Sequence, residues 1–179
     1  MSWKSRGLRG SFLEEIINLT NEYYRTNNIA LIQKIPTPIT PIEIDKATSH
    51  ITLAYFDKKS TVDYIGVAQG VPICFDAKEC ATDTFSLQNI HEHQMEFLSD
   101  FKAQGGIAFI LIYYTKKNLI YYMSVDELRV FYDRAVNGGR KSIKFEELRK
   151  RCFYQVSQSM YINYLEFVND ELEEIDADN

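Results

Sequence analysis

The sequence predicts an α/β protein in which a mixed β-sheet is covered by helices. Segments with helical periodicity and segments with strand periodicity are interspersed along the 179 residues, and turn signals separate them. The stretch 107–114 is continuously apolar, as expected of a strand covered on both faces. The length suits one domain with a substantial core. We expect that domain over 1–169 and an acidic C-terminal tail over 170–179.

The first elements are a helix, a strand and an extended excursion. Apolar residues recur at helical spacing over 11–24, and Ser11 and Glu14 have the spacing of a capping box. A short strand is expected over 28–35. Three prolines then follow within six residues, so about 36–53 is predicted to be an extended, stalk-like excursion rather than a central strand, with 50–56 returning as a strand.

The stretch TVDYIGVAQGVPICFDAKE, residues 61–79, is predicted to be a hairpin. Gln69 and Gly70 suit a two-residue turn, and in that register the numbers of paired residues sum to 139. Pro72 has no N–H, so an unpaired strand edge or a bulge is expected near it.

The second half of the chain alternates between helices and strands. Ser86 is predicted to cap a helix that continues to about Gln104. Ser124 and Glu127 have the spacing of another capping box. The remaining segments are expected to be strands at 107–114 and 119–123 and helices at 124–135, 142–150 and 162–172.

The net charge of −5 comes from the end of the chain. The last ten residues carry six acids and no base, and without them the chain has 20 basic and 19 acidic residues. We expect this tail to be frayed or solvated. The acidic balance does not exclude a polyanionic partner, since basic residues cluster near Arg9 and at Arg140 and Lys141, although such clusters are also common on ordinary surfaces.

Composition argues against a membrane protein and against a disulfide framework. No apolar run is long enough to span a bilayer, and the basic start lacks the apolar segment of a signal peptide. Cys74, Cys80 and Cys152 have neither metal-binding spacing nor an even count. We expect reduced thiols in a cytoplasmic protein.

The hairpin register places two acids opposite each other. Asp63 faces Asp76 in a non-hydrogen-bonded pair, and Lys78 lies on the same face. Two such carboxylates must share a proton, pair with the lysine or bind a divalent cation such as Mg²⁺. If they bind a cation, Asp63, Asp76 and Lys78 resemble the D…(D/E)-x-K arrangement of metal-dependent nucleases. The alternative is a solvated pair at a sheet edge.

The chain resembles the RecU family of Holliday-junction resolvases, also called penicillin-binding-protein-related factor A. The resemblance covers most of the length and rests on several motifs in order. They are RG-x-x-LE (9–14), PTP (36–38), AYF (54–56), ST-x-DY-x-G (60–66), F-x-AKE (75–79), F-x-LQN-x-H-x-HQ (85–94) and NGGRKSI (137–143).

This resemblance implies a restriction-endonuclease-like fold, a homodimer and a Mg²⁺-dependent endonuclease, with Mn²⁺ as the alternative metal. Such enzymes nick four-way DNA junctions symmetrically in recombination and repair, leaving 5′-phosphates and 3′-hydroxyls, and a RecA-type recombinase is the partner expected beside the DNA. By the motif match, Asp63, Asp76 and the Ala77 carbonyl would hold the metal, and Lys78 would be the catalytic lysine.

Other residues have two readings. Glu14 either completes the cap with Ser11 or reaches a water at the metal from the first helix, and Gln88 would lie at the edge of the site. His91 and His93, two apart, could not share one side of a helix, so a paired metal site is not expected. Contacts to DNA are expected from a set of basic and polar residues, namely Arg9, Lys46, Gln88, Arg140 and Lys141.

Three positions depart from the family pattern. Val62 occupies a position that is often Thr, with Thr61 one place earlier, and Asp76 replaces the usual Glu, which shortens that side chain by one methylene. The stalk is usually basic, whereas here Lys46 and His50 stand against two acids. Because phosphate contacts dominate DNA affinity, we expect weaker junction binding or a different grip on the junction centre.

The sequence is also compatible with two other functions. A junction-binding protein that does not cut and that modulates a recombinase would use the same surface. A restriction-type nuclease acting on ordinary duplex would need a specificity segment, and none is recognisable in the sequence.

Overall fold

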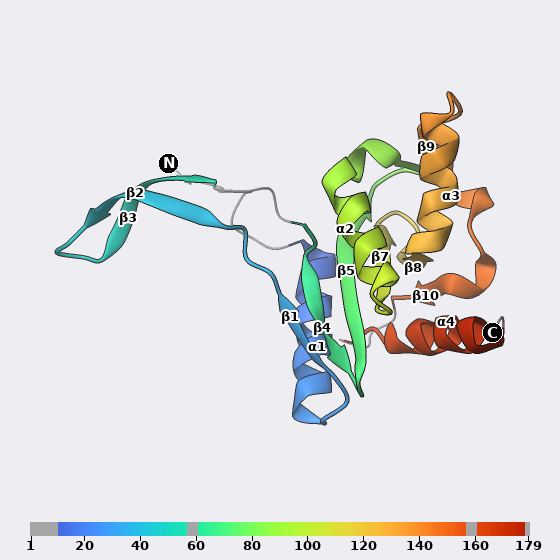
Figure 1. The fold of residues 1–179 in the computed structure, drawn as a ribbon, viewed down its shortest axis with the longest axis horizontal. Coiled ribbons are helices and arrows are strands. Elements are labelled where there is room, and N and C mark those ends of the chain that lie inside the picture. The colour runs from blue at the N-terminus through green and yellow to red at the C-terminus, as the bar shows by residue number, and fades with distance from the viewer. Residues whose placement is uncertain (1–10, 57–60, 157–160, 178–179) are drawn as a thin grey trace.

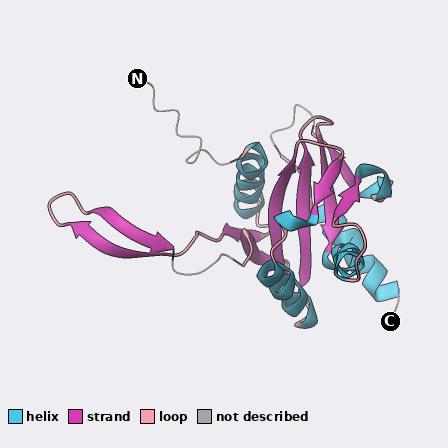
Figure 2. Cartoon of the chain, turned by 90° about the horizontal axis from the view of Figure 1, so that it is seen from above, coloured by secondary structure: helices cyan, strands magenta, loops and turns pink. Residues whose placement is uncertain are grey.

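The protein is built on a six-stranded mixed sheet with helices on both faces (Figure 1, Figure 2). The computed structural model describes residues 11–56, 61–156 and 161–177. The strand order is β1-β4-β5-β7-β8-β10. These strands are β1 (Leu31–Lys34), β4 (Tyr64–Ala68), β5 (Val71–Cys80), β7 (Ile107–Tyr114), β8 (Leu119–Ser124) and β10 (Phe153–Gln155). The predicted mixed α/β sheet is confirmed.

Strand β5 lies at the centre of the sheet. It pairs antiparallel with β4 and parallel with β7, which in turn pairs antiparallel with β8. All eight residues of β7 are buried, as the apolar run predicted. Pairing between β5 and β7 begins at Ile73, so Pro72 lies where the strand has a neighbour on one side only. The missing N–H of Pro72 therefore costs no hydrogen bond of the β5–β7 ladder.

Successive residues of β5 point to opposite faces of the sheet. Phe75 packs toward Tyr164, which directly precedes α4 (Leu165–Ala177), and α1 (Phe12–Thr26) covers the same face. On the other face, Asp76 points toward α2 (Glu92–Ala103), which packs beside α3 (Val125–Val136). The predicted caps of α1 and α3, at Ser11 and Ser124, are both present.

Aromatic rings from neighbouring strands form the core on the α1 side. Tyr64 stacks on Phe75 with 4.8 Å between ring centroids, and Phe75 stacks on Phe109 at 4.7 Å. Phe109 continues the row to Tyr122 at 4.5 Å. Tyr64, Phe75 and Phe109 are fully buried. This row joins four strands and holds β4 and β5 in a fixed position relative to the rest of the sheet.

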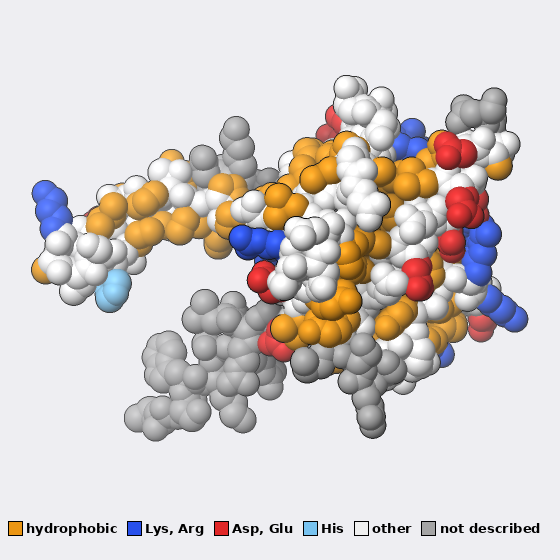
Figure 3. All heavy atoms as spheres, turned by 90° about the horizontal axis from the view of Figure 1, so that it is seen from below, with side chains coloured by type: hydrophobic (Ala, Val, Ile, Leu, Met, Phe, Trp, Pro, Cys, Tyr) orange, Lys and Arg blue, Asp and Glu red, His pale blue; other side chains and the backbone are white. Residues whose placement is uncertain are grey.

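The Pro-rich excursion forms a separate two-stranded hairpin that projects from the body (Figure 1). Its strands are β2 (Ile39–Asp45) and β3 (His50–Phe56), and we call them together the stalk. Its surface is largely apolar (Figure 3). The exposed large apolar residues of the stalk are Ile39, Ile42, Ile44, Ile51, Leu53, Tyr55 and Phe56.

Two predicted helices differ from the structure. Ser86 caps only the short turn η1 (Leu87–Asn89), and α2 begins later, at Glu92. The segment predicted as a helix over 142–150 instead contains β9 (Ser142–Lys144), which pairs with β6 (Thr84–Ser86), and the short turns η2 (Phe145–Glu147) and η3 (Lys150–Cys152). In both places pairing between β6 and β9 overrides the local helical pattern.

The acidic C-terminal segment is more ordered than the sequence suggested. Helix α4 continues to Ala177, and Glu171 is buried. Its Oε2 accepts a hydrogen bond of 2.5 Å from the Tyr122 hydroxyl, and burial raises the pKa of the Glu171 carboxyl. The segment is therefore helical rather than frayed through Ala177, whereas Asp170, Glu173, Glu174 and Asp176 are exposed to solvent as expected. Within the described ranges, no helix is long and apolar enough to cross a membrane.

Candidate active site

The hairpin formed by β4 and β5 has the predicted register. Every pair from Ala68 with Val71 to Tyr64 with Phe75 sums to 139. The turn residues Gln69 and Gly70 have φ values of 48° and 93°, and two positive φ values are the signature of the turn that best fits a two-residue hairpin. The register places the next pair, Asp63 and Asp76, at the open end of the hairpin.

Asp63 directly precedes β4 and is held at both its backbone and its side chain. Its carbonyl accepts a hydrogen bond of 2.8 Å from the Ile35 N–H. Its Oδ2 accepts one of 2.9 Å from the Ala77 N–H on β5. These two contacts fix the carboxylate beside the strand that carries Asp76.

Asp76 is completely buried and lies against two charged neighbours. Burial is the largest effect on its carboxyl and raises its pKa to about 7. Lys78, which forms an ion pair with Asp76 Oδ2, lowers that pKa, whereas contact with the Asp63 carboxyl raises it. Asp63 and Asp76 thus meet on one face with Lys78 beside them, as the hairpin register predicted.

Gln94 is a site residue that the sequence analysis did not single out. It lies on α2, is buried, and donates from Nε2 to Asp76 Oδ1 at 3.3 Å. Its Oε1 accepts from the His91 N–H at 3.2 Å, which fixes the orientation of the amide. Gln88, which was expected at the edge of the site, is exposed on η1. The sequence feature that indicates Gln94 is its place as the final Gln of the F-x-LQN-x-H-x-HQ motif.

Glu14 takes part in the predicted cap and forms an ion pair with β1. Its N–H donates to Ser11 Oγ at 3.3 Å, and its Oε2 pairs with Lys34 Nζ at 2.9 Å. Burial raises the pKa of the Tyr64 hydroxyl, and the charges of Glu14 and Asp63 add to that effect. Glu14 therefore completes the predicted cap, and its charge acts on Tyr64, the residue that follows Asp63 in the chain.

The two histidines are arranged differently from the expectation. His91 is the N-cap of α2 rather than a residue within the helix, and its ring stacks on that of His93 with 5.4 Å between centroids. The expectation that they could not lie on one side was wrong because the helix starts later than predicted. Among the described residues, however, no three His, Cys, Asp or Glu side chains form a group that could hold a metal.

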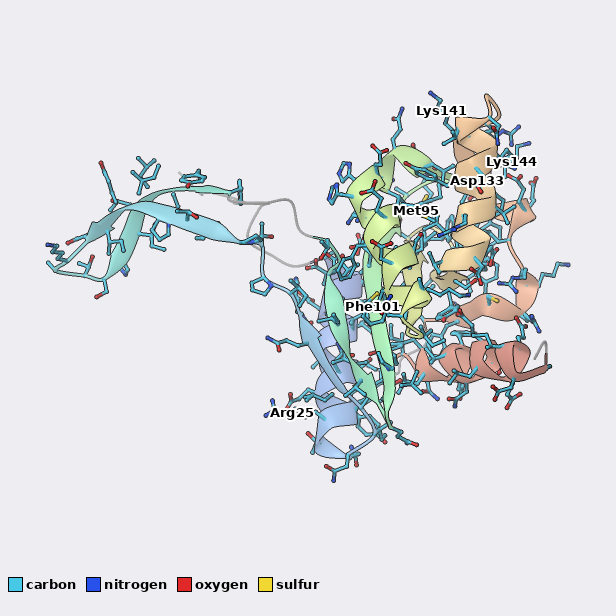
Figure 4. The ribbon with its side chains drawn as sticks, viewed as in Figure 1. Arg25, Met95, Phe101, Asp133, Lys141 and Lys144 are labelled. Atoms are coloured by element: carbon cyan, nitrogen blue, oxygen red, sulfur yellow. The ribbon has the colours of Figure 1, made fainter. Side chains whose placement is uncertain are left out.

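The described residues among the predicted DNA contacts lie in two places. Gln88 and Lys141 are close together, because the Leu87 N–H donates to the Lys141 carbonyl at 3.1 Å, and Arg140 precedes Lys141 in the same turn. Figure 4 shows Lys141 and Lys144 at the upper end of α3. Lys46 lies at the exposed turn of the stalk. Arg9 lies outside the described residues.

The acidic pair suits a hard divalent cation. Asp76 Oδ2 is buried and is paired with the Lys78 ammonium, which supplies one positive charge against two carboxylates. A cation that prefers one or two carboxylates together with carbonyl and water oxygens fits this donor set. The Ala77 carbonyl lies between Asp76 and Lys78 in the chain and is a further candidate oxygen.

We expect Asp76→Asn to remove a pH dependence from stability. Burial in the folded protein raises the pKa of the Asp76 carboxyl from its ordinary value of 3.8 to about 7. Between these pH values the folded state binds more protons, so the free energy of unfolding falls as pH rises and levels off above 7. Urea denaturation in EDTA at pH 5 and pH 8 measures this fall in the free energy of unfolding. Asp76→Asn should reduce the fall, whereas Asp133→Asn, a control at an exposed acid, should leave it unchanged. An unchanged fall in Asp76→Asn would contradict the assignment.

The family model and the relatives found by sequence agree on one family. The family model described as RecU, Recombination protein U, matches residues 8–170. The Holliday junction resolvase RecU of Pediococcus pentosaceus is 42% identical over 176 residues, covering 94% of this chain and 87% of that protein. That of Bacillus subtilis is 42% identical over 149 residues, covering 81% and 71%. Among solved structures, the Holliday junction resolvase Hjc of Archaeoglobus fulgidus matches with a TM-score of 0.39 and 8% identity, covering 63% of this chain and 76% of that one.

Proposed function

Because this chain belongs to the RecU family, we propose that it is a divalent-metal-dependent endonuclease that resolves four-way DNA junctions by paired, symmetric nicks. The observation that carries the proposal is the juxtaposition of Asp63, buried Asp76 and Lys78 at the open end of the hairpin. Two facing carboxylates repel each other and also repel DNA phosphates. A protein that only bound junctions would gain nothing from keeping them.

Asp63, Asp76 and the Ala77 carbonyl would hold Mg²⁺, with Mn²⁺ as the alternative. A bound cation of this kind supplies a Lewis acid that stabilises charge on the phosphate and lowers the pKa of water. Gln94 keeps the Asp76 carboxylate in one orientation through its hydrogen bond to Oδ1. Burial of Asp76 keeps bulk water away from that carboxylate.

Lys78 stabilises the negative charge that develops on the scissile phosphate. Its ammonium lies beside Asp76, with its side chain partly exposed, so it can reach a bound phosphate while remaining paired. In the reaction a water oxygen bonds to phosphorus, the bond from phosphorus to the 3′ oxygen breaks, and the proton that the water loses is balanced by the proton that the 3′ oxygen gains. The products are a 5′-phosphate and a 3′-hydroxyl. Glu14, on the first turn of α1, would lie at the edge of this site.

The DNA backbone is contacted on the surface near the site. Gln88, Arg140 and Lys141 share the β6–β9 end of the body, and exposed cations bind phosphates in a salt-dependent manner. Lys46 at the stalk turn and Arg9 near the start of the chain are the other proposed contacts. We further propose that residues 1–169 act as one nuclease domain, with 170–179 as an acidic C-terminal segment, and that a RecA-type recombinase is its partner in the cytoplasm. The three cysteines, which are free and buried, suit that reducing compartment.

We propose a homodimer, which gives one site for each nicked strand, and place the stalk in its interface. Alternation puts Ile51, Leu53 and Tyr55 on one face of β3, and Ile44 pairs with Ile51. Each of these side chains is about half exposed. A contiguous apolar face of this kind is a common mark of a protein interface, and an isolated two-stranded hairpin is only marginally stable in water.

Leu53→Glu should shift the protein from dimer to monomer, because a charge would be buried in the apolar face. Sedimentation equilibrium over a range of protein concentrations measures this shift. Thr52→Glu, which places the same charge on the opposite face of the stalk, should leave the dimer intact. If wild type and both variants sediment alike, the stalk face is not the interface.

The function itself is tested with a labelled four-way junction and a linear duplex of matched sequence, each in Mg²⁺ and in EDTA. Metal-dependent paired nicks on the junction alone are expected. Junction binding without nicks in Mg²⁺ or Mn²⁺ would instead favour the non-cleaving alternative, a junction-binding protein that modulates a recombinase. Equal cutting of the duplex would indicate a restriction-type nuclease.

A further inference from the structure

Four consecutive residues at the end of β5 each make a different contact around the candidate active site. The Asp76 carboxylate meets Asp63, the Ala77 N–H holds Asp63 Oδ2, and Lys78 pairs with Asp76. The fourth residue is Glu79, whose side chain points to the opposite face of the sheet, toward α1. Its Oε1 accepts a hydrogen bond of 3.1 Å from the Leu13 N–H.

The Glu79 contact is a cap supplied to α1 from a distant part of the chain. The first N–H groups of a helix have no partner within the helix. Ser11 Oγ satisfies the Glu14 N–H locally, whereas Glu79, 66 residues away in sequence, satisfies the Leu13 N–H. A carboxylate at a helix N-terminus is favourable for its charge as well as its hydrogen bond. The start of α1 is thus tied to the strand that carries the catalytic lysine.

This hydrogen bond completes a closed series of contacts around the acidic pair, which we call the circuit. From β5 it runs through Glu79 to the first turn of α1, and from Glu14 to Lys34 on β1 at 2.9 Å. Strand β1 then reaches the hairpin, because the Ile35 N–H donates to the Asp63 carbonyl at 2.8 Å. The Asp63 carboxylate returns the circuit to β5 at the Ala77 N–H.

We propose that Glu79 is a positioning residue of the nuclease site, which holds α1 and β1 so that Asp63 stays at the correct separation from Asp76. The inference rests on the proposed function. Glu79 is not one of the proposed metal ligands, and it acts through α1 and β1 on the backbone of Asp63. Its loss should therefore appear first in the affinity for the cation, because two carboxylates bind a cation well only when their spacing is fixed.

The test compares Glu79→Ala with Ser11→Ala and Glu79→Gln. Ser11→Ala removes the local cap from the same helical turn, so it matches the loss of a cap without opening the circuit. Glu79→Gln retains an oxygen that accepts the Leu13 N–H. The readouts are Mn²⁺ binding by calorimetry without DNA, the Mg²⁺ midpoint of junction cleavage, junction affinity in EDTA, and the melting temperature.

We expect Glu79→Ala to weaken Mn²⁺ binding and raise the Mg²⁺ midpoint by about tenfold, the loss typical when an outer partner of a metal site is removed. Junction affinity in EDTA should not change. Ser11→Ala should lower the melting temperature as much as Glu79→Ala does but leave Mn²⁺ binding as in wild type. Glu79→Gln should retain most of the wild-type affinity for Mn²⁺.

Two outcomes overturn the inference while leaving the nuclease intact. In one, Glu79→Ala binds Mn²⁺ like wild type. In the other, Ser11→Ala weakens Mn²⁺ binding as much as Glu79→Ala, which would make Glu79 an ordinary helix cap. A wild-type protein that does not cut junctions in any metal would instead refute the proposed function, and calorimetry would still report whether Glu79 affects cation binding.

Discussion

Asp63→Asn should abolish junction cleavage in Mg²⁺ while leaving the fold and junction binding intact. The substitution removes one of the two charges that would hold the cation. Loss of outer partners of a metal site alone costs about 10–100-fold, so loss of a direct ligand should lower the cleavage rate by at least about 100-fold. Single-turnover cleavage of a labelled junction measures this rate.

The same substitution should not destabilise the protein. An asparagine can still accept the Ala77 N–H through its side-chain oxygen, and it removes the repulsion between Asp63 and Asp76. In EDTA the free energy of unfolding at pH 8 should therefore equal or exceed that of wild type. Asp133→Asn, an exposed acid on α3, serves as the control for both measurements. Cleavage by Asp63→Asn within about tenfold of the wild-type rate would remove Asp63 from the proposed metal site.

Lys78→Met should produce the other large loss of activity. Methionine retains much of the aliphatic side chain but removes the ammonium that pairs with Asp76 and would stabilise the phosphate. Removal of one such stabilising group typically costs about 100–1000-fold in catalytic rate, and the loss should persist at saturating Mg²⁺. Rates measured across a Mg²⁺ titration separate this effect from weaker cation binding.

Cation binding itself should survive in Lys78→Met. Lys78 competes with a cation for Asp76 Oδ2, so its loss should leave Mn²⁺ binding unchanged or stronger in calorimetry at pH 8, where Asp76 is largely ionised. Lys116→Met, at an exposed position in the turn after β7, is the control for the loss of a surface charge. Full activity in Lys78→Met would show that the lysine neutralises Asp76 and has no catalytic part.

Much of the fold follows from local patterns in the sequence. The hairpin register follows from a two-residue turn and strict alternation, and β7 follows from an uninterrupted apolar run. The segments that were predicted wrongly, at 86–91 and 142–150, are those where β6 and β9 pair across about 60 residues. Local helical spacing contains no information about such distant pairing.

The candidate site, like the fold, has features that follow from local sequence patterns and features that depend on distant contacts. The facing acids and the lysine follow from counting outward along one hairpin, and Gln94 could not be found this way because its contact with Asp76 depends on how α2 packs on the sheet. The histidine arrangement was missed because it depends on where α2 begins. The burial of Glu171 likewise depends on the position of Tyr122, and an acidic composition alone does not predict it.

The stalk contributes no described residue to the hydrophobic core of the body. Residues of the stalk can therefore be substituted without compensating changes in the packed aromatic rings that support Asp63 and Asp76. Natural variation could thus retune how such an enzyme holds branched DNA while its bond-breaking chemistry stays constant. The apolar composition of this stalk is an outcome that such independence permits.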